Sequence, residues 1–156
     1  MKVRIIPFAE EFSGDFARLN YEWLKKYFVV EPHDVEMLEA PNEYIISKGG
    51  EILFAVYQDE IVGTVALIKI NDEYFEIAKM AVTEKYQGLS IGRLLLNDAL
   101  EWAKNNAVKK LMLESNRKLK PALKLYKSVG FYEIPSDPDS PYERADIKME
   151  LIMENV

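Results

Sequence analysis

The 156-residue sequence contains no cysteine and only one histidine, His33. The missing cysteine excludes disulfides, thiolate metal ligands and a thiol nucleophile. A single histidine leaves no histidine-based metal cage and no Ser-His-Asp triad, so we expect no metal site. No apolar run approaches the roughly 18 residues of a membrane-spanning helix, and the first residues are too acidic for a signal peptide. We therefore expect a single soluble domain, residues 1–156, that is cytoplasmic and has no membrane partner.

Charge is abundant and unevenly distributed along the chain, whose formal net charge is −6. Residues 9–60 hold twelve acidic and four basic side chains, whereas residues 79–127 hold eleven basic and four acidic ones. Within residues 117–127 there are five basic side chains and no acidic one. A short basic segment on an acidic protein suits a compact polyanion such as a nucleotide phosphate, and we expect no nucleic acid partner. The alternative is that these side chains form an ordinary solvated helix face.

Hydrophobic patterning predicts a mixed α/β fold. Short apolar or alternating runs predict strands at residues 2–6, 52–57, 61–70, 74–82, 110–114, 131–134 and 146–153. Helical spacing predicts helices at residues 13–28, 34–39, 90–105 and 119–129. Ser13 is the expected N-cap of the first helix, and Gly130 the expected C-cap of the last. The strands between residues 52 and 82 follow one another through short turns, which predicts an antiparallel meander.

Small residues connect the strand at 74–82 to the helix that begins near residue 90. Backbone N–H groups at a helix start lack partners, and the helix dipole adds positive potential, so such a loop can bind phosphate. The loop has neither the Gly-Lys-Ser/Thr of a nucleotide-binding P-loop nor the GxGxxG of a dinucleotide-binding site. Its Gly88-x-x-x-Gly92 spacing is too common to identify a site alone.

Two longer motifs are more specific. The sequence EIAKMAV at 76–82, followed by YQGLSIG at 86–92, resembles the acetyl-coenzyme A motif of the GNAT-type N-acetyltransferases. That family's loop is usually Gln/Arg-x-x-Gly-x-Gly/Ala, and here Gln87, Ser90 and Gly92 hold those places, with serine replacing a glycine. The family's later segment, Asn…Ala-x-x-Leu-Tyr-x-x-x-Gly-Phe, resembles Asn116, Ala122, Leu125, Tyr126, Gly130 and Phe131. The resemblance spans residues 51–153 and implies the acyl-CoA N-acyltransferase fold, a twisted, mostly antiparallel sheet of about seven strands with about four flanking helices.

The resemblance also implies acetyl-CoA (coenzyme A) as the cofactor and assigns residues to it. Main-chain groups of Met80, Ala81 and Val82 would pair with the pantetheine arm like an added strand. The pyrophosphate would lie against the loop residues, which are Gln87, Gly88, Leu89, Ser90, Ile91, Gly92 and Arg93. Asn116 would bond to the pantetheine, Ala122 would leave room for it, and Tyr126 would lie near the sulfur. Asn116 has an alternative interpretation as a plain turn residue.

Acetyl transfer to an amine needs a base, because most amines are protonated at neutral pH. Glu76 is the candidate base, since regular alternation places it on one strand face with Ala78 and Met80. The alternative for Glu76 is an ion pair with Lys69 on a neighbouring strand. Tyr126 is the candidate acid that protonates the departing thiolate, and its alternative is a purely structural core position. We expect direct attack in a ternary complex, with a backbone N–H near residues 80–82 stabilising the oxyanion.

The acceptor is the least constrained part of the prediction. In the family it lies against the first two helices and the loop before the last strand, which here suggests Tyr27, Phe28, Glu31 and Arg144. The acidic segment suits a cationic amine, whereas Arg144 suits the carboxylate of an amino acid. We expect a small amine or an amino acid. The alternatives are a protein N-terminus or lysine, and a non-catalytic coenzyme A sensor.

Two further expectations come from resemblance alone. Asn20, Trp23, Tyr27, Phe28 and Glu31 are spaced as in the acetyltransferase halves of some MarR-fused regulators. No winged-helix half is present in the sequence, so we do not expect this chain alone to be such a regulator. A homodimer is expected because many members of the family pair.

Overall fold

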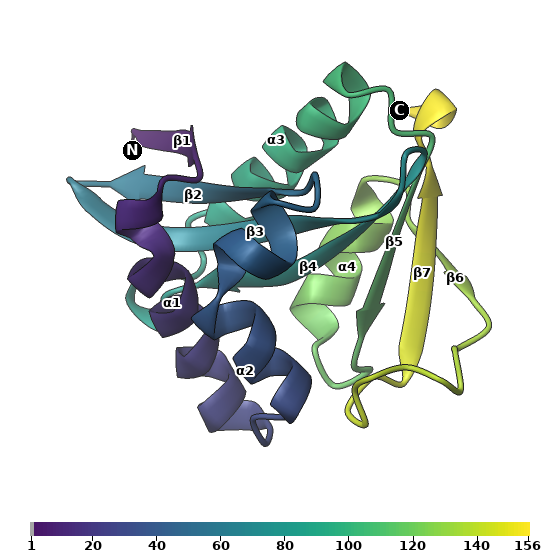
Figure 1. The fold of residues 1–156 in the computed structure, drawn as a ribbon, viewed down its shortest axis with the longest axis horizontal. Coiled ribbons are helices and arrows are strands. Elements are labelled where there is room, and N and C mark those ends of the chain that lie inside the picture. The colour runs from purple at the N-terminus through teal and green to yellow at the C-terminus, as the bar shows by residue number, and fades with distance from the viewer. Residues whose placement is uncertain (1) are drawn as a thin grey trace.

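The computed structural model describes residues 2–156 and is built around a seven-stranded sheet (Figure 1). Met1, the first residue of the predicted domain, lies outside the described part. The strand order is β1-β2-β3-β4-β5-β7-β6, and every neighbouring pair is antiparallel except β4–β5. The strands are β1 (Val3–Pro7), β2 (Glu51–Tyr57), β3 (Glu60–Asn71), β4 (Tyr74–Val82), β5 (Lys110–Ser115), β6 (Tyr132–Ile134) and β7 (Ile147–Ile152).

Helices cover both faces of this sheet, which therefore separates two hydrophobic cores (Figure 1). Helices α1 (Ser13–Tyr27) and α2 (Pro32–Glu39) pack on one face, and α3 (Ile91–Asn105) and α4 (Lys120–Ser128) on the other. Because strand side chains alternate, Ile52 and Phe54 enter the α1–α2 core while Leu53 and Ala55 enter the α3–α4 core. Both faces of β2 and β3 are thus buried, which explains their nearly continuous apolar sequences. Short helical turns lie at Glu10–Phe12, Asn42–Ile46, Glu84–Tyr86 and Met153–Asn155.

The predicted sheet, meander and four long helices are confirmed, with boundaries within about two residues. The predicted cap is wrong: Ser13 is the first residue of α1, and its hydroxyl donates to Glu10 at 3.2 Å. The helical turn at Asn42–Ile46 was not predicted from the sequence. None of the helices in residues 2–156 is both long and apolar enough to cross a membrane.

Strands β4 and β5 separate soon after they meet. They pair only where Tyr74, Phe75 and Glu76 lie beside residues 110–112. Beyond Glu76 the two strands diverge, and the space between them lies beside α4 (Figure 1). The edge of β4 that faces β5 is therefore without a strand partner from Ile77 to Val82 within the described residues. This opening positions the candidate site.

A β-bulge interrupts β4 at Lys79, whose φ is +54°. The register with β3 shifts there, because Ala66 lies opposite Ala78 while Thr64 lies opposite Ala81. Alternation consequently changes phase, so that Met80 packs against the α3–α4 core. Glu76, opposite Ile68 of the α1–α2 core, stays on the other face. The expectation that Glu76 and Met80 share a strand face is therefore wrong, because the bulge inserts one residue between them.

Candidate active site

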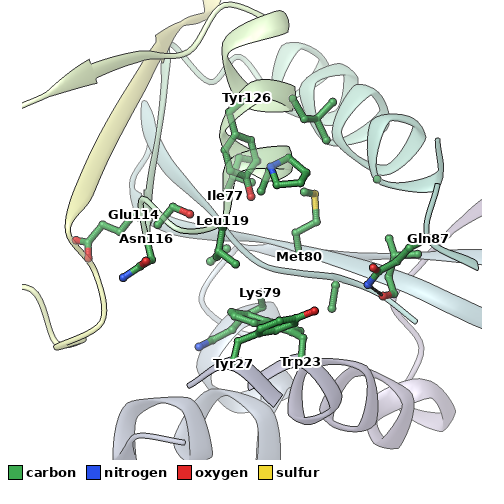
Figure 2. Close-up of a pocket in the computed structure, with 18 of the residues that line it drawn as sticks. Trp23, Tyr27, Ile77, Lys79, Met80, Gln87, Glu114, Asn116, Leu119 and Tyr126 are labelled. Carbon is green, nitrogen blue, oxygen red and sulfur yellow. Dashed lines mark hydrogen bonds between the residues drawn. The ribbon is translucent and has the colours of Figure 1, made fainter. Parts of the chain in front are cut away.

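A cavity of about 850 Å³, here called the main cavity, occupies the divergence of β4 and β5. Figure 2 shows side chains from β4, the β4–α3 loop, β5, α4 and α1 pointing toward it. Its lining comprises residues 23, 27–28, 76–82, 86–88, 90–93, 114–116, 118–119, 121–122, 125–126, 142 and 144–145. All predicted site residues lie in this lining except Leu89 and Glu31. Leu89 is 40% exposed on the loop, and Glu31 lies behind Arg144, to which it is bonded.

The loop before α3 presents a row of free backbone N–H groups at one end of the main cavity. Within the described chain, no hydrogen bond is donated by the N–H groups of residues 88–93. Ser90 occupies the N-cap position with φ +63°, and its hydroxyl does not cap the helix. A side chain at Gly88 would meet no atom within 4 Å, so the space in front of the loop is open. Such a cradle at the start of a 15-residue helix fits a phosphate group.

Neither the Gln87 side chain nor most of the basic segment at residues 117–127 is directed at the phosphate cradle. The Gln87 side chain donates to the Val82 carbonyl at 3.0 Å and so ties the loop to the end of β4. Among the five basic residues of 117–127, Lys118 lines the main cavity, and Arg117 is paired with Glu133. The other three, Lys120, Lys124 and Lys127, are exposed on α4 or its start. The solvated-face interpretation therefore describes most of this segment.

Glu76 lines the main cavity, and its side chain is half-buried. No side chain or backbone group described in the structure donates a hydrogen bond to it. Burial, with repulsion from Glu114, raises the pKa of Glu76 to about 7, although Lys79 and Lys148 act in the opposite direction. The alternative pairing with Lys69 is wrong, because Lys69 bonds to Asp72 at 2.8 Å. Glu76 therefore has the pKa of a group that exchanges protons near neutral pH.

Tyr126 projects from α4 into the main cavity and lies on the same side as Met80 (Figure 2). Its ring also packs edge-on against Phe131, with ring centres 6.0 Å apart. Burial raises the pKa of Tyr126 to about 12, so its hydroxyl keeps its proton at neutral pH. Tyr126 is therefore both part of the hydrophobic core and part of the cavity lining, two locations that the sequence analysis treated as alternatives.

The part of the main cavity lined by Trp23, Tyr27, Phe28, Tyr142 and Arg144 is here called the acceptor wall. A buried charge cluster behind this wall has no counterpart in the sequence prediction. Asp34 of α2 is fully buried and accepts hydrogen bonds from Lys79 at 2.6 Å and from Arg144 at 2.7 and 2.8 Å. Burial alone would raise the pKa of Asp34, but these cationic donors lower it to about 2. Lys79 also donates to the Tyr142 hydroxyl at 2.8 Å. The one available signal was Lys79 itself, a lone cation within a mostly apolar strand.

Arg144 was expected to hold a substrate carboxylate, and the structure gives it protein carboxylates instead. In addition to Asp34, it donates to Glu31 at 3.0 Å. Its guanidinium also lies 4.4 Å from the centre of the Tyr142 ring and 6.0 Å from those of Trp23 and Phe28. The Arg144 guanidinium is therefore already paired with protein carboxylates, because the loop folds back onto α2. A contact between Arg144 and a substrate carboxylate stays a prediction.

Asn116 makes the contacts of a turn residue. Its side-chain nitrogen donates to the Arg144 carbonyl at 2.7 Å, and its oxygen accepts from the Lys118 N–H at 3.0 Å. These bonds hold the β6–β7 loop beside the end of β5. A contact between Asn116 and pantetheine stays a prediction.

The family model described as "Acetyltransferase (GNAT) family" matches residues 17–131. The chain belongs to this family. A curated relative, the uncharacterized N-acetyltransferase YvbK of Bacillus subtilis, is 30% identical over 65% of this chain and 67% of its own length. Matches to the four curated relatives cover between 33% and 67% of those proteins.

Solved structures show that the fold is that of GNAT acetyltransferases. One, from Staphylococcus aureus Mu50, superposes with a TM-score of 0.86 over 97% of this chain and 99% of its own, at 22% identity. Another, from Elizabethkingia anophelis, was solved with acetyl-CoA bound; its TM-score is 0.66 at 26% identity, over 96% of this chain and 97% of its own. The family and the fold expected from the two motifs are thereby confirmed.

Proposed function

We propose that this GNAT protein transfers an acetyl group from acetyl-CoA to a primary amine by direct attack in a ternary complex. The observation that carries the proposal is the layout of the main cavity. It joins the free N–H groups of residues 88–93 to Glu76 and Tyr126, two groups that can accept and donate a proton near pH 7. The family match and the relative solved with acetyl-CoA support the same activity.

The residues of the main cavity fit coenzyme A at both ends of that molecule. The N–H groups of residues 88–93 would hold the pyrophosphate, with Arg93 beside them. The unpaired edge of β4 offers main-chain groups to the pantetheine amides, as in the addition of a strand to a sheet. Ala122 contributes a small side chain to the wall between these ends. When bound, acetyl-CoA supplies an acetyl group activated as a thioester.

Glu76 and Tyr126 divide the proton transfers between them. Glu76 takes a proton from the acceptor ammonium, which leaves the amine lone pair free for attack. Tyr126 keeps its proton at neutral pH and can supply it to the departing sulfur. A backbone N–H on the unpaired β4 edge, at residues 80–82, stabilises the negative charge that develops on the carbonyl oxygen. Holding both reactants in one cavity provides the remaining acceleration.

Thermal unfolding with acetyl-CoA, with coenzyme A and with ATP tests the binding step. A ligand at a hundredfold its Kd stabilises the native state by about 2.7 kcal/mol, which a melting curve resolves. We expect stabilisation by acetyl-CoA and not by ATP, followed by amine-dependent release of free thiol. If acetyl-CoA stabilises the protein but no amine causes release of the coenzyme A thiol, the sensor alternative is favoured. If acetyl-CoA does not stabilise the protein, the proposed cofactor is refuted.

A further inference from the structure

The acceptor end of the main cavity contains cations that are already neutralised by the protein. Lys79, whose side chain is 4% exposed, is bonded to Asp34 and Tyr142. Arg144, 15% exposed, is bonded to Asp34 and Glu31. Asp34 and Glu31 do not line the main cavity, so the two carboxylates sit behind the wall that the two cations form. An incoming carboxylate would compete with both of them for the same donors.

The carboxylates that do line the cavity, Glu76 and Glu114, have no such partner. In the described chain neither forms an ion pair; Glu114 accepts a hydrogen bond from the Ser140 hydroxyl. Lys118, a lining cation four positions after Glu114, donates a hydrogen bond to the Tyr27 carbonyl at 3.2 Å and lies 4.3 Å from the centre of the Phe28 ring. Lys148 of β7 acts on Glu76 through space but does not line the cavity. A substrate carboxylate placed here would meet the Glu114 carboxylate and the ionised fraction of Glu76, both of the same sign as itself.

The rest of this wall is aromatic. Trp23 and Phe28 pack edge-to-face with ring centres 5.8 Å apart, and Tyr27 and Tyr142 also line the cavity. Figure 2 shows Trp23 and Tyr27 on α1, across the cavity from Tyr126. Aromatic faces favour both an apolar body and the positive charge of an ammonium group.

We infer, resting on the proposed function, that the acceptor is a primary amine with an apolar body and no carboxylate beside its amino group, rather than an amino acid. Glu76 and Glu114 attract the ammonium, the aromatic wall receives the body, and the paired state of Arg144 and Lys79 makes both cations unavailable to a carboxylate. The Asp34–Arg144–Lys79 cluster thereby disfavours amino acids as acceptors, in addition to holding the acceptor wall in place.

Matched pairs of acceptors test this inference, because phenethylamine differs from phenylalanine, and cadaverine from lysine, only in the carboxylate. We expect kcat/KM to be larger for the decarboxylated member of each pair by about tenfold or more, and phenethylamine to exceed cadaverine. Equal or better use of phenylalanine, or of lysine at its α-amino group, would overturn the inference, and better use of cadaverine than of phenethylamine would overturn the apolar body. If acetyl-CoA stabilises the protein but no amine is acetylated, the inference also fails. Absence of both stabilisation and thiol release would instead refute the proposed function.

A variant that removes a carboxylate partner of Arg144 should gain activity toward an amino acid. A folding defect would not produce such a gain. Glu31→Gln removes one of the two carboxylates bonded to the Arg144 guanidinium. We expect the ratio of phenylalanine to phenethylamine kcat/KM to rise several-fold, whereas a folding defect would lower both rates and leave the ratio unchanged. Glu36→Gln, on the exposed side of α2, is the matched control and should not change the ratio. An unchanged ratio in Glu31→Gln would contradict the exclusion role of the Glu31–Arg144 pair.

Discussion

The Lys79 ammonium lies 2.6 Å from the Asp34 carboxylate, although the two residues belong to β4 and α2 and are 45 positions apart. Arg144 reaches the same carboxylate from the β6–β7 loop. Asp34 thus joins the bulge of β4, the start of α2 and the loop that closes the acceptor wall. The cluster fixes the relative positions of three segments around Glu76.

Removing the Asp34 charge should strongly destabilise the fold. Asp34→Asn leaves Lys79 and Arg144 buried with less compensation, and breaking a buried pair in this way costs about 3–5 kcal/mol. Urea unfolding at neutral pH measures the loss. Lys109→Met is the control, because it removes an exposed pair with Glu73 and should barely change stability. A similar small effect from Asp34→Asn would show that the cluster does not hold the segments together.

The Asp34 carboxylate should also make the free energy of unfolding decrease at acidic pH. The pKa of Asp34 is about 2 in the folded protein and about 3.9 in an unfolded chain, so the native state binds fewer protons between these values. Its contribution is therefore complete above about pH 4 and is lost as pH falls toward 2. We expect the difference in unfolding free energy between the wild type and Asp34→Asn to shrink over this window. A difference that stays constant down to the acid unfolding of the protein would contradict the assigned pairing.

Ser90 carries backbone strain that glycine would remove. A non-glycine residue in the left-handed region costs roughly 1–2 kcal/mol, and Ser90 has φ +63°. Ser90→Gly should therefore raise Tm, and the acetyl-CoA shift should be retained because the free N–H groups remain. Ser13→Gly is the matched control, since Ser13 has φ −55° at the start of α1 and glycine there weakens a helix. Melting curves of both variants should move in opposite directions; a lower Tm for Ser90→Gly would contradict the strain.

Tyr126→Phe separates binding from chemistry. The hydroxyl has no hydrogen-bond partner among the described residues, so its loss should leave both stability and the acetyl-CoA melting shift unchanged. Loss of the acid should lower kcat by about 100-fold or more. Single-turnover transfer measured beside a melting curve distinguishes the two effects. Unchanged kcat with wild-type binding would return Tyr126 to a structural role.

The elements and most of the cavity lining could be predicted from the sequence because their signals are local. Strand alternation, helical spacing and the small residues of 86–92 depend on neighbouring positions, and they place Glu76, Gln87 and Tyr126 in one cavity. The β4 bulge was not predicted, since Lys79 adopts a positive φ that the sequence does not require of a lysine. Because of this bulge, Met80 and Glu76 lie on opposite faces of the sheet.

The roles of Arg144 and Asp34 could not be predicted for a different reason. Their pairing joins residues 110 positions apart, and its strength comes from burial that exists only after the sheet and α2 have assembled. The sequence showed a polar loop and an acidic helix, and each looked available to a substrate. Their mutual neutralisation is a property of the tertiary structure.

Glu114 should affect the pKa of the candidate base Glu76 without accepting the proton itself. Its charge contributes to the raised pKa of Glu76, so Glu114→Gln should lower that pKa and move the acid limb of kcat to lower pH. Glu154→Gln, in the turn after β7, serves as a remote control. An acid limb that does not move would show that Glu76 and Glu114 are not coupled.

The pH dependence of kcat at saturating acetyl-CoA and phenethylamine tests the central claim most directly, with product identified by mass spectrometry. We predict N-acetylated product and an acid limb with an apparent pKa of about 7, the value set by burial of Glu76. Glu76→Gln should abolish that limb and lower kcat by about 100-fold or more. A protein that binds acetyl-CoA but whose acid limb persists unchanged in Glu76→Gln would contradict the account.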